Sequence, residues 1–414
     1  MKLGWVDFDE KSLKLAKDIM SALDQPGARD YLGLGVVRDR ISDYLFPGTS
    51  VLMKGAGYFF LVPKAIRDYQ KIAVKSQLSV SQLETSIYEI EKRQAIRLQK
   101  DFPKMSFIGA SNLKRSKQTK FVEILPSDAY WVGLQKFNII PTTKNKNSFL
   151  RDLANPINAG KSWCDLSNEN LDNMSITLKL GIDESLYLIK KISMISYDGE
   201  KFPFPPLLSC LPQYLDPYKE EGHIEFPWDI KREGLNLDNK AWKHYSSILN
   251  EAKVISHLIC IAFRAYGHNV SEMPNYVNSI EAANAKELFK SKYEILREVC
   301  ITGKILSEDF ANVNNLFLDA KFRSGMSFLK IIGNLVVENP TGRQFLLKSK
   351  NIIKLQEFKS KPKRHLRLTP LAEEDTNSMF HSSQWNGVEM ARLVDYRWPT
   401  VRRILHDICI GAHG

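Results

Sequence analysis

Residues 44–63 read Tyr-Leu-Phe-Pro-Gly-Thr-Ser-Val-Leu-Met-Lys-Gly-Ala-Gly-Tyr-Phe-Phe-Leu-Val-Pro, and this stretch decides the fold of the N-terminal part of the chain. Pro47-Gly48 is a turn signal, and the two hydroxyl residues that follow it can cap a new helix. From Leu52 onward, apolar side chains cover more than half of the helix circumference, which predicts a buried element. We expect Pro63 to kink or end this helix, because proline lacks a backbone donor.

Two glycines in this stretch, Gly55 and Gly57, would let another backbone approach closely. A functional interpretation is a groove for a ligand or a nucleic acid. A structural interpretation is tight packing against another part of the protein, and we favour it.

The composition is that of an ordinary globular protein, with 414 residues, 43% hydrophobic and 25% charged. This length predicts two or three modules with a core that needs neither disulfides nor metals. The five cysteines are odd in number and far apart, which fits neither a zinc site nor a disulfide framework and indicates a reducing cytoplasm. The longest apolar stretch, residues 254–263, is about half a membrane span, so we expect a soluble, cytoplasmic protein.

The net charge of +11 is concentrated in two basic windows. Residues 92–120 and residues 343–367 each hold nine Lys or Arg against one acid. Clustering of this kind is typical of proteins with a polyanionic partner. The alternative is a pair of ordinary solvated surfaces.

Hydrophobic periodicity predicts a mainly α fold, a multi-helix body with a small β element near residues 106–125. Residues 202–206, Phe-Pro-Phe-Pro-Pro, predict an extended connector. Gly267 is expected to end the clearest helix, which starts at Trp242. The predicted helices cover residues 13–23, 36–46, 52–63, 77–100, 126–134, 178–195, 242–266, 288–306, 310–328 and 399–409. The apolar stripe of the helix over 52–63 continues beyond Pro63 through Ile66, Tyr69 and Ile72.

Three segments follow from this pattern. Residues 1–140 form an N-terminal helical module with the LFPGTS motif of residues 45–50. Residues 141–240 are an Asn/Lys- and Pro-rich middle segment, of which 141–172 is a candidate linker or surface excursion. Residues 241–414 form a C-terminal helical module with the second basic window and a terminal DYRWPTVRRIL helix.

Several short motifs occur in an order and spacing that resemble an uncharacterised bacterial family, a domain of unknown function. They are LGWVDF (3–8), LGVVRD (34–39), LFPGTS (45–50), YFFLVP (58–63), IGA (108–110), LPS (125–127), YWVGL (130–134), FPFPP (202–206) and DYRWPTVRRIL (395–405). Members tend to sit in phage-defence or mobile gene neighbourhoods beside helicases and phospholipase-D-like nucleases, so the resemblance implies a defence role. The chain departs from this family at residues 54–57, where relatives carry more Thr and Arg.

No group of residues in the sequence meets the spacing requirements of a catalytic or metal-binding site. Residues 158–162, Asn-Ala-Gly-Lys-Ser, lack the first glycine and the leading strand of a phosphate loop. Glu357-Phe358-Lys359 has a nuclease-like spacing but lacks an upstream acid, and the histidines are scattered. We interpret Asp395 with Arg397 as a structural ion pair and Trp398 as a core residue. We therefore expect no catalytic residue, no metal and no cofactor.

The remaining candidate is a nucleic-acid site that binds phosphates, because long cations on polar segments position a backbone without reading its sequence. Aromatic residues for stacking are sparse nearby, which favours duplex DNA over single strands. Its expected residues are Lys114, Arg115, Lys117, Lys359, Lys361, Lys363, Arg364, Arg367, Arg402 and Arg403.

The leading hypothesis is a non-enzymatic nucleic-acid-binding subunit of an anti-phage system that acts with a helicase or nuclease partner. Under this hypothesis, the two basic windows form one positive surface. One alternative is a metal-dependent nuclease or other enzyme whose acids meet only in three dimensions. Another is a protein-interaction scaffold.

Overall fold

The chain divides into two compact units, each of which combines segments from distant parts of the sequence. Unit 1 comprises Met1–Ile41 and Lys243–Tyr396, and unit 2 comprises Ser42–Trp242 and Arg397–Gly414. The expected segments 1–140 and 241–414 are each divided between the two units, whereas residues 141–240 lie wholly in unit 2. The computed structural model describes residues 30–76, 80–110, 113, 121–122, 124–158, 160–197, 202–213, 224–233, 235, 237–273, 279–303, 310–360 and 392–413. The helix expected over residues 13–23 lies outside these ranges.

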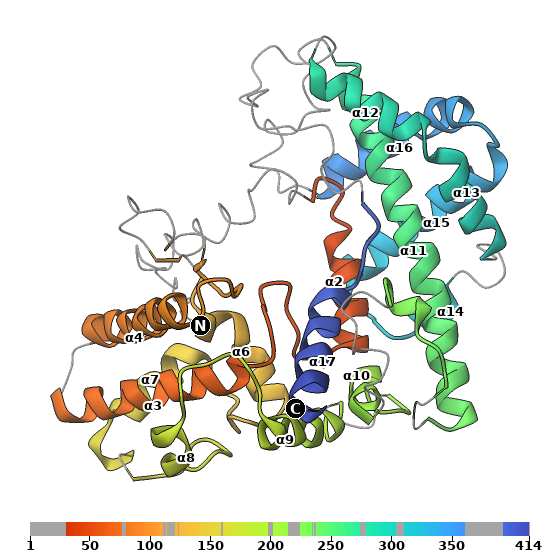
Figure 1. Cartoon of the computed structure of the whole chain (residues 1–414). Coiled ribbons are helices and arrows are strands. Elements are labelled where there is room, and N and C mark those ends of the chain that lie inside the picture. Colours follow the sequence, from red (N-terminus) through yellow and green to blue (C-terminus); the bar gives the residue numbers. More distant parts are fainter. Residues whose placement is uncertain are drawn as a thin grey trace, which may run out of the picture. The chain divides into compact units, whose positions relative to one another are not determined.

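The secondary structure of the described residues is helical (Figure 1), which confirms the prediction of a mainly α protein. Two helices, α2 (Gly35–Leu45) and α11 (Asn239–Ser271), contain two of the three boundaries between the units, and the third lies just before α17. Unit 2 holds α3 (Tyr58–Ser76), α4 (Val80–Asp101), α6 (Pro126–Lys136), α7 (Lys146–Ala154), α8 (Asn168–Asn173), α9 (Ile182–Ser193), α10 (Leu207–Cys210) and α17 (Trp398–His413). Unit 1 holds α12 (Ile280–Lys290), α13 (Tyr293–Thr302), α14 (Ala311–Asn314), α15 (Ala320–Glu338) and α16 (Gly342–Ser360).

The β element expected near residues 106–125 is wrong for the described part of that segment, which contains no strand. Its backbone donors have other partners. The N–H of Ile108 donates to the hydroxyl of Tyr58 at 2.8 Å, and the N–H of Phe121 donates to the hydroxyl of Tyr88 at 2.7 Å. Because tyrosine hydroxyls satisfy these groups, the segment needs no partner strand.

The core of unit 2 is built around α3, which packs against α4, α6, α7 and α8. The helix begins at Tyr58 rather than near Leu52, and residues 51–57 form turns and irregular backbone instead. Pro63 lies inside the helix and does not end it. Apolar side chains on both sides of the proline, including Phe59 and Ile66, are fully buried, and their burial outweighs the lost backbone hydrogen bond.

The last helix, α17, begins one residue before the expected Pro399 and packs against α9. Trp398 is completely buried, as expected, and its indole donates to the carbonyl of Ile224 at 2.9 Å. Arg397 forms an ion pair with Asp43 at 2.6 Å and donates to the carbonyl of Thr49 at 2.9 Å. The terminal motif therefore holds the LFPGTS turn in place from within unit 2.

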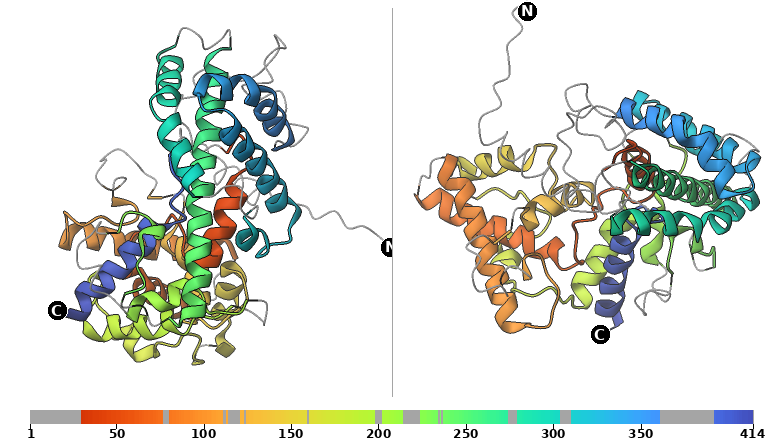
Figure 2. Two further views of the ribbon diagram at one scale, coloured as in Figure 1. Left: turned by 90° about the vertical axis from the view of Figure 1, so that its right-hand side faces the viewer. Right: turned by 90° about the horizontal axis from the view of Figure 1, so that it is seen from above.

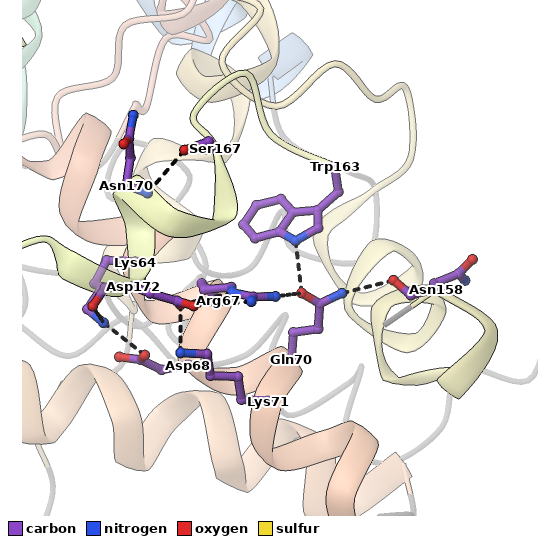
Figure 3. A network of polar contacts seen from close by, with 10 residues as sticks. All are labelled: Lys64, Arg67, Asp68, Gln70, Lys71, Asn158, Trp163, Ser167, Asn170 and Asp172. Atoms are coloured by element: carbon purple, nitrogen blue, oxygen red, sulfur yellow. Dashed lines mark hydrogen bonds and ion pairs between the residues drawn. The ribbon is translucent and has the colours of Figure 1, made fainter. Parts of the chain in front are cut away.

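Residues 141–172 are not an unstructured linker, because they fold onto α3 through the polar contacts drawn in Figure 3. Arg67 of α3 donates two hydrogen bonds, of 3.0 and 3.2 Å, to the carboxylate of Asp172. Lys71 forms an ion pair with the same carboxylate at 2.6 Å. The indole of Trp163 donates to the side-chain oxygen of Gln70 at 3.0 Å. These contacts explain why a polar stretch is ordered.

In unit 1, α12, α13, α15 and α16 lie beside α11 (Figures 1 and 2). Arg264 of α11 donates to the carbonyl of Leu288 at 2.6 Å, and the hydroxyl of Tyr266 donates to Glu357 of α16 at 2.7 Å. The helix continues through Gly267, contrary to expectation, because buried residues on both sides of the glycine outweigh its weak helix propensity. The helix expected over residues 288–306 is interrupted at 291–292, where α12 ends and α13 begins.

Among the described residues, α11 is long and apolar enough to cross a membrane by length and composition. However, 72% of its most apolar window is buried inside the protein. Burial to this extent is the pattern of a core helix.

Candidate functional site

A cavity of about 530 Å³ opens in unit 2 beside the first basic window. Its walls come from the turn after the LFPGTS motif, from residues 104–110, and from Ile124 and Ala129. Two exposed lysines, Lys54 and Lys104, stand among mostly apolar neighbours in this lining. The cavity therefore combines an apolar surface with two cations.

Two buried tyrosines hold the walls of this cavity in place. The hydroxyl of Tyr130 accepts from the N–H groups of Lys54 and Gly55 at 2.8 and 3.0 Å and donates to the carbonyl of Gly55 at 2.7 Å. The hydroxyl of Tyr58 accepts from Ile108 at 2.8 Å, and the two rings lie 5.0 Å apart. Burial raises the pKa of both phenols, so they remain neutral hydrogen-bonding groups.

The glycines of residues 55–57 are packed against protein atoms. An added Cβ atom at Gly57 would lie 2.4 Å from the carbonyl oxygen of Leu178, and one at Gly55 would lie 2.6 Å from the carboxylate of Asp407. The same carboxylate accepts from the N–H of Ala56 at 2.7 Å. This geometry agrees with the packing interpretation and leaves no room for a ligand at these two glycines.

A buried carboxyl group joins α4 to the start of α6. Glu91 is 2% exposed and accepts from the N–H and the hydroxyl of Ser127 at 2.8 and 3.1 Å. Burial raises the pKa of Glu91 to about 8, although the nearby Lys146 acts in the opposite direction. The contact fixes the N-terminus of the helix that supplies Ala129 to the cavity and Tyr130 to its wall.

A row of exposed cations extends from this cavity along α4. Arg93, Arg97 and Lys100 recur at helical spacing on the side of α4 that faces solvent, and Lys104 continues the row just after the helix ends. The opposite side of α4 is buried through Ile87, Ile90, Ala95 and Leu98. Among the described residues, Arg97 forms an ion pair within the row, with Asp101 at 3.5 Å. We refer to Arg93, Arg97, Lys100 and Lys104 as the α4 cation row.

Most of the site residues expected from the sequence lie outside the described residues. These are Lys114, Arg115, Lys117, Lys361, Lys363, Arg364 and Arg367.

The three that are described belong to different units. Lys359 is exposed on α16 of unit 1, whereas Arg402 and Arg403 are half-buried on α17 of unit 2. Arg402 donates to the carbonyl of Ile224 at 2.9 Å. The two basic windows likewise fall in separate units, and their union into one positive surface stays a prediction.

The nuclease-like pair Glu357 and Lys359 does not converge. Glu357 is 1% exposed and accepts from Tyr266, whereas Lys359 is exposed to solvent. Within the described ranges, no group of three His, Cys, Asp or Glu side chains has a geometry that could hold a metal ion. Arg397 pairs with Asp43. The ion pair of Arg397 with Asp395 that the sequence suggests stays a prediction.

The cavity and the α4 cation row were not identified from the sequence as a site. The first basic window contains the whole row, and the spacing of four, three and four residues was a signal that could have found it. Lys54 was noted as a departure from the family pattern. The cavity itself had no sequence signal, because its walls depend on hydrogen bonds between residues 50 to 76 positions apart.

Residues 1–166 match the sequence model of a family described as "Family of unknown function (DUF6361)". The match covers less than half of the chain but includes every residue that lines the cavity and the complete α4 cation row. It supports the expected likeness to an uncharacterised family over this part. No curated protein and no solved structure matches the chain.

Proposed function

We propose that unit 2 binds the phosphodiester backbone of nucleic acid, with duplex DNA as the preferred form, through the α4 cation row and the neighbouring Lys54. The observation that carries this proposal is the row itself: three exposed cations at the spacing of one helix face, followed by the exposed Lys104 just after the helix. Three of them have no ion pair with a described acid. Uncompensated, exposed cations in a line are suited to a polyanion.

The dimensions of the row are compatible with a DNA backbone. Arg93 and Lys100 are seven residues apart, which is about 10 Å along a helix. This distance corresponds to about three base-pair steps of a duplex. Because the row offers long charged side chains without a groove-reading element, it contacts phosphates and does not read the base sequence.

The role within a larger system is the second part of the proposal. The protein acts as a non-enzymatic subunit of an anti-phage defence system, with a helicase or a nuclease as its partner. This part is supported by the resemblance to an uncharacterised family with members in such gene neighbourhoods.

Fluorescence anisotropy with a labelled 30-base-pair duplex tests the binding. The variant with Arg97→Gln, Lys100→Gln and Lys104→Gln should bind at least tenfold more weakly than the wild type at low salt, because it loses three phosphate contacts. A charge-matched control carries Lys231→Gln, Lys240→Gln and Lys321→Gln, at exposed lysines outside both basic windows and the cavity lining. The control should bind like the wild type.

Equal weakening of duplex binding in both triple variants would show that binding depends on net charge and not on the α4 cation row. Unchanged binding in the α4 variant, together with loss of binding in Lys361→Glu, Lys363→Glu and Arg364→Glu, would move the site to the second basic window. Either result would overturn the proposal.

A further inference from the structure

A second cavity, of about 620 Å³, lies in unit 1. It is formed by the C-terminal end of α11, by residues of α12 and α13, and by the first turns of α16. Its volume is in the range of pockets that hold small molecules. None of its lining belongs to the site proposed for nucleic acid in unit 2.

The cavity lining contains buried polar groups that the protein leaves unsatisfied. Asn269 is 3% exposed, yet its side-chain nitrogen has no hydrogen-bond partner among the described residues. The Nδ1 atom of His268 also has none within that part of the chain, and the nearest carboxylate oxygen, from Glu272, is 3.9 Å away. A buried donor without an acceptor is destabilising, so a ligand that supplies an acceptor gains from binding there.

The charges around the cavity favour an anion. Arg343, Lys350 and Lys290 line it, against two carboxylates, Glu272 and Glu294. Glu272 is already engaged with Lys350 at 3.6 Å. One positive charge is therefore left in excess in the lining.

The start of α16 adds to this preference. The helix begins at Gly342. Thr341 accepts from the backbone N–H groups of Gln344 and Phe345, which leaves those of Gly342 and Arg343 without an acceptor within the helix. Gly342 and Arg343 both line the cavity, which places this positive end of the helix dipole at its wall.

The remainder of the lining is apolar and aromatic. Phe289 and Tyr293 are buried, with ring centres 5.3 Å apart, and Leu346 and Leu347 stand on the opposite helix. Leu347 is 74% exposed, a large value for leucine in a folded protein. An apolar ligand body would cover this surface.

From these observations we infer that the cavity of unit 1 binds a small organic anion, with an oxyanion, phosphate or carboxylate, attached to an apolar or aromatic body. The oxyanion lies at the start of α16 between Arg343 and the amide of Asn269, and the body lies against Leu346 and Leu347. Two cations of the second basic window, Arg343 and Lys350, then serve this cavity. The inference stands independently of nucleic-acid binding in unit 2.

Calorimetric titration of the full-length protein tests the inference with three probes of similar size: phenyl phosphate, benzoate and benzyl alcohol. We expect at least one of the two anions to bind and the uncharged alcohol not to bind. Whether phenyl phosphate or benzoate binds more tightly distinguishes the two oxyanions. Arg343→Gln should weaken binding of the anion at least fivefold, whereas Lys348→Gln, an exposed cation on the same helix outside the cavity, should not change it.

Asn269→Leu provides a second, independent readout. Because the amide nitrogen is unpaired, its replacement should leave the melting temperature of the free protein unchanged or raise it, while it weakens anion binding. The inference is overturned if neither anion binds at millimolar concentration, or if benzyl alcohol binds equally well. It is also overturned if Lys348→Gln has the same effect as Arg343→Gln, or if Asn269→Leu leaves anion binding unchanged.

Discussion

Gly57 lies where the turn after the LFPGTS motif meets the backbone of Leu178, and a methyl group there would overlap the carbonyl oxygen at 2.4 Å. We predict that Gly57→Ala destabilises unit 2 by about 1–3 kcal/mol, the usual range for overpacking. Urea unfolding followed by circular dichroism measures this change. Gly160→Ala is the matched control, because an added Cβ at that position would meet no atom within 4 Å. Equal stability of the two variants would contradict the packing account.

Glu91 makes the stability of unit 2 depend on pH. Burial raises its pKa from an ordinary value of 4.5 to about 8, so the folded protein binds more protons than the unfolded chain between these values. Stability should therefore fall as pH rises through this window and level off above it.

Glu91→Gln keeps an acceptor for Ser127 but cannot ionise, and this substitution should remove the decline. We predict that the melting temperature drops less between pH 6 and pH 8.5 in Glu91→Gln than in the wild type. An identical drop in both proteins would show that Glu91 does not titrate in this range.

At the scale of the elements, the sequence predicted the helices whose ends carry local signals. Helices α2, α4, α6 and α17 begin and end within about four residues of the predicted bounds. The predictions failed where tertiary burial overrides a local rule, as at Pro63 inside α3 and Gly267 inside α11. They also failed where side-chain hydroxyls replace a backbone partner, as at Ile108. The charge of the candidate site was readable from the sequence, but its cavity was not, since Tyr58 and Tyr130 form its walls through distant contacts.

The carboxylate of Asp172 is one of the groups that attach α8 to α3 (Figure 3). Hydrogen bonds from Arg67 lower the pKa of Asp172 to about 2, with Lys71 contributing, so this stabilisation is present above about pH 4 and is lost as pH falls through 2. Asp172→Asn should speed hydrogen exchange in residues 155–173 at neutral pH. Asp183→Asn, the same change on an exposed acid of α9, should leave hydrogen exchange in residues 155–173 unchanged. An equal increase in exchange in this control would contradict the role assigned to Asp172.

At the scale of the whole molecule, the two basic windows of the sequence lie in different compact units. The sequence could not predict this division, because each unit joins segments more than 150 residues apart. The first window supplies the α4 cation row, and the described part of the second contributes two cations to the cavity of unit 1. We thus propose a different anionic partner for each window.

The salt dependence of duplex binding tests the central claim most directly, because its slope counts the phosphate contacts. For the wild type and for the variant with Arg97→Gln, Lys100→Gln and Lys104→Gln, the affinity is measured between 50 and 200 mM salt. Three lost contacts should make the log–log slope of the variant shallower by about 2.7. Identical slopes in the two proteins would contradict a phosphate-binding role for the α4 cation row.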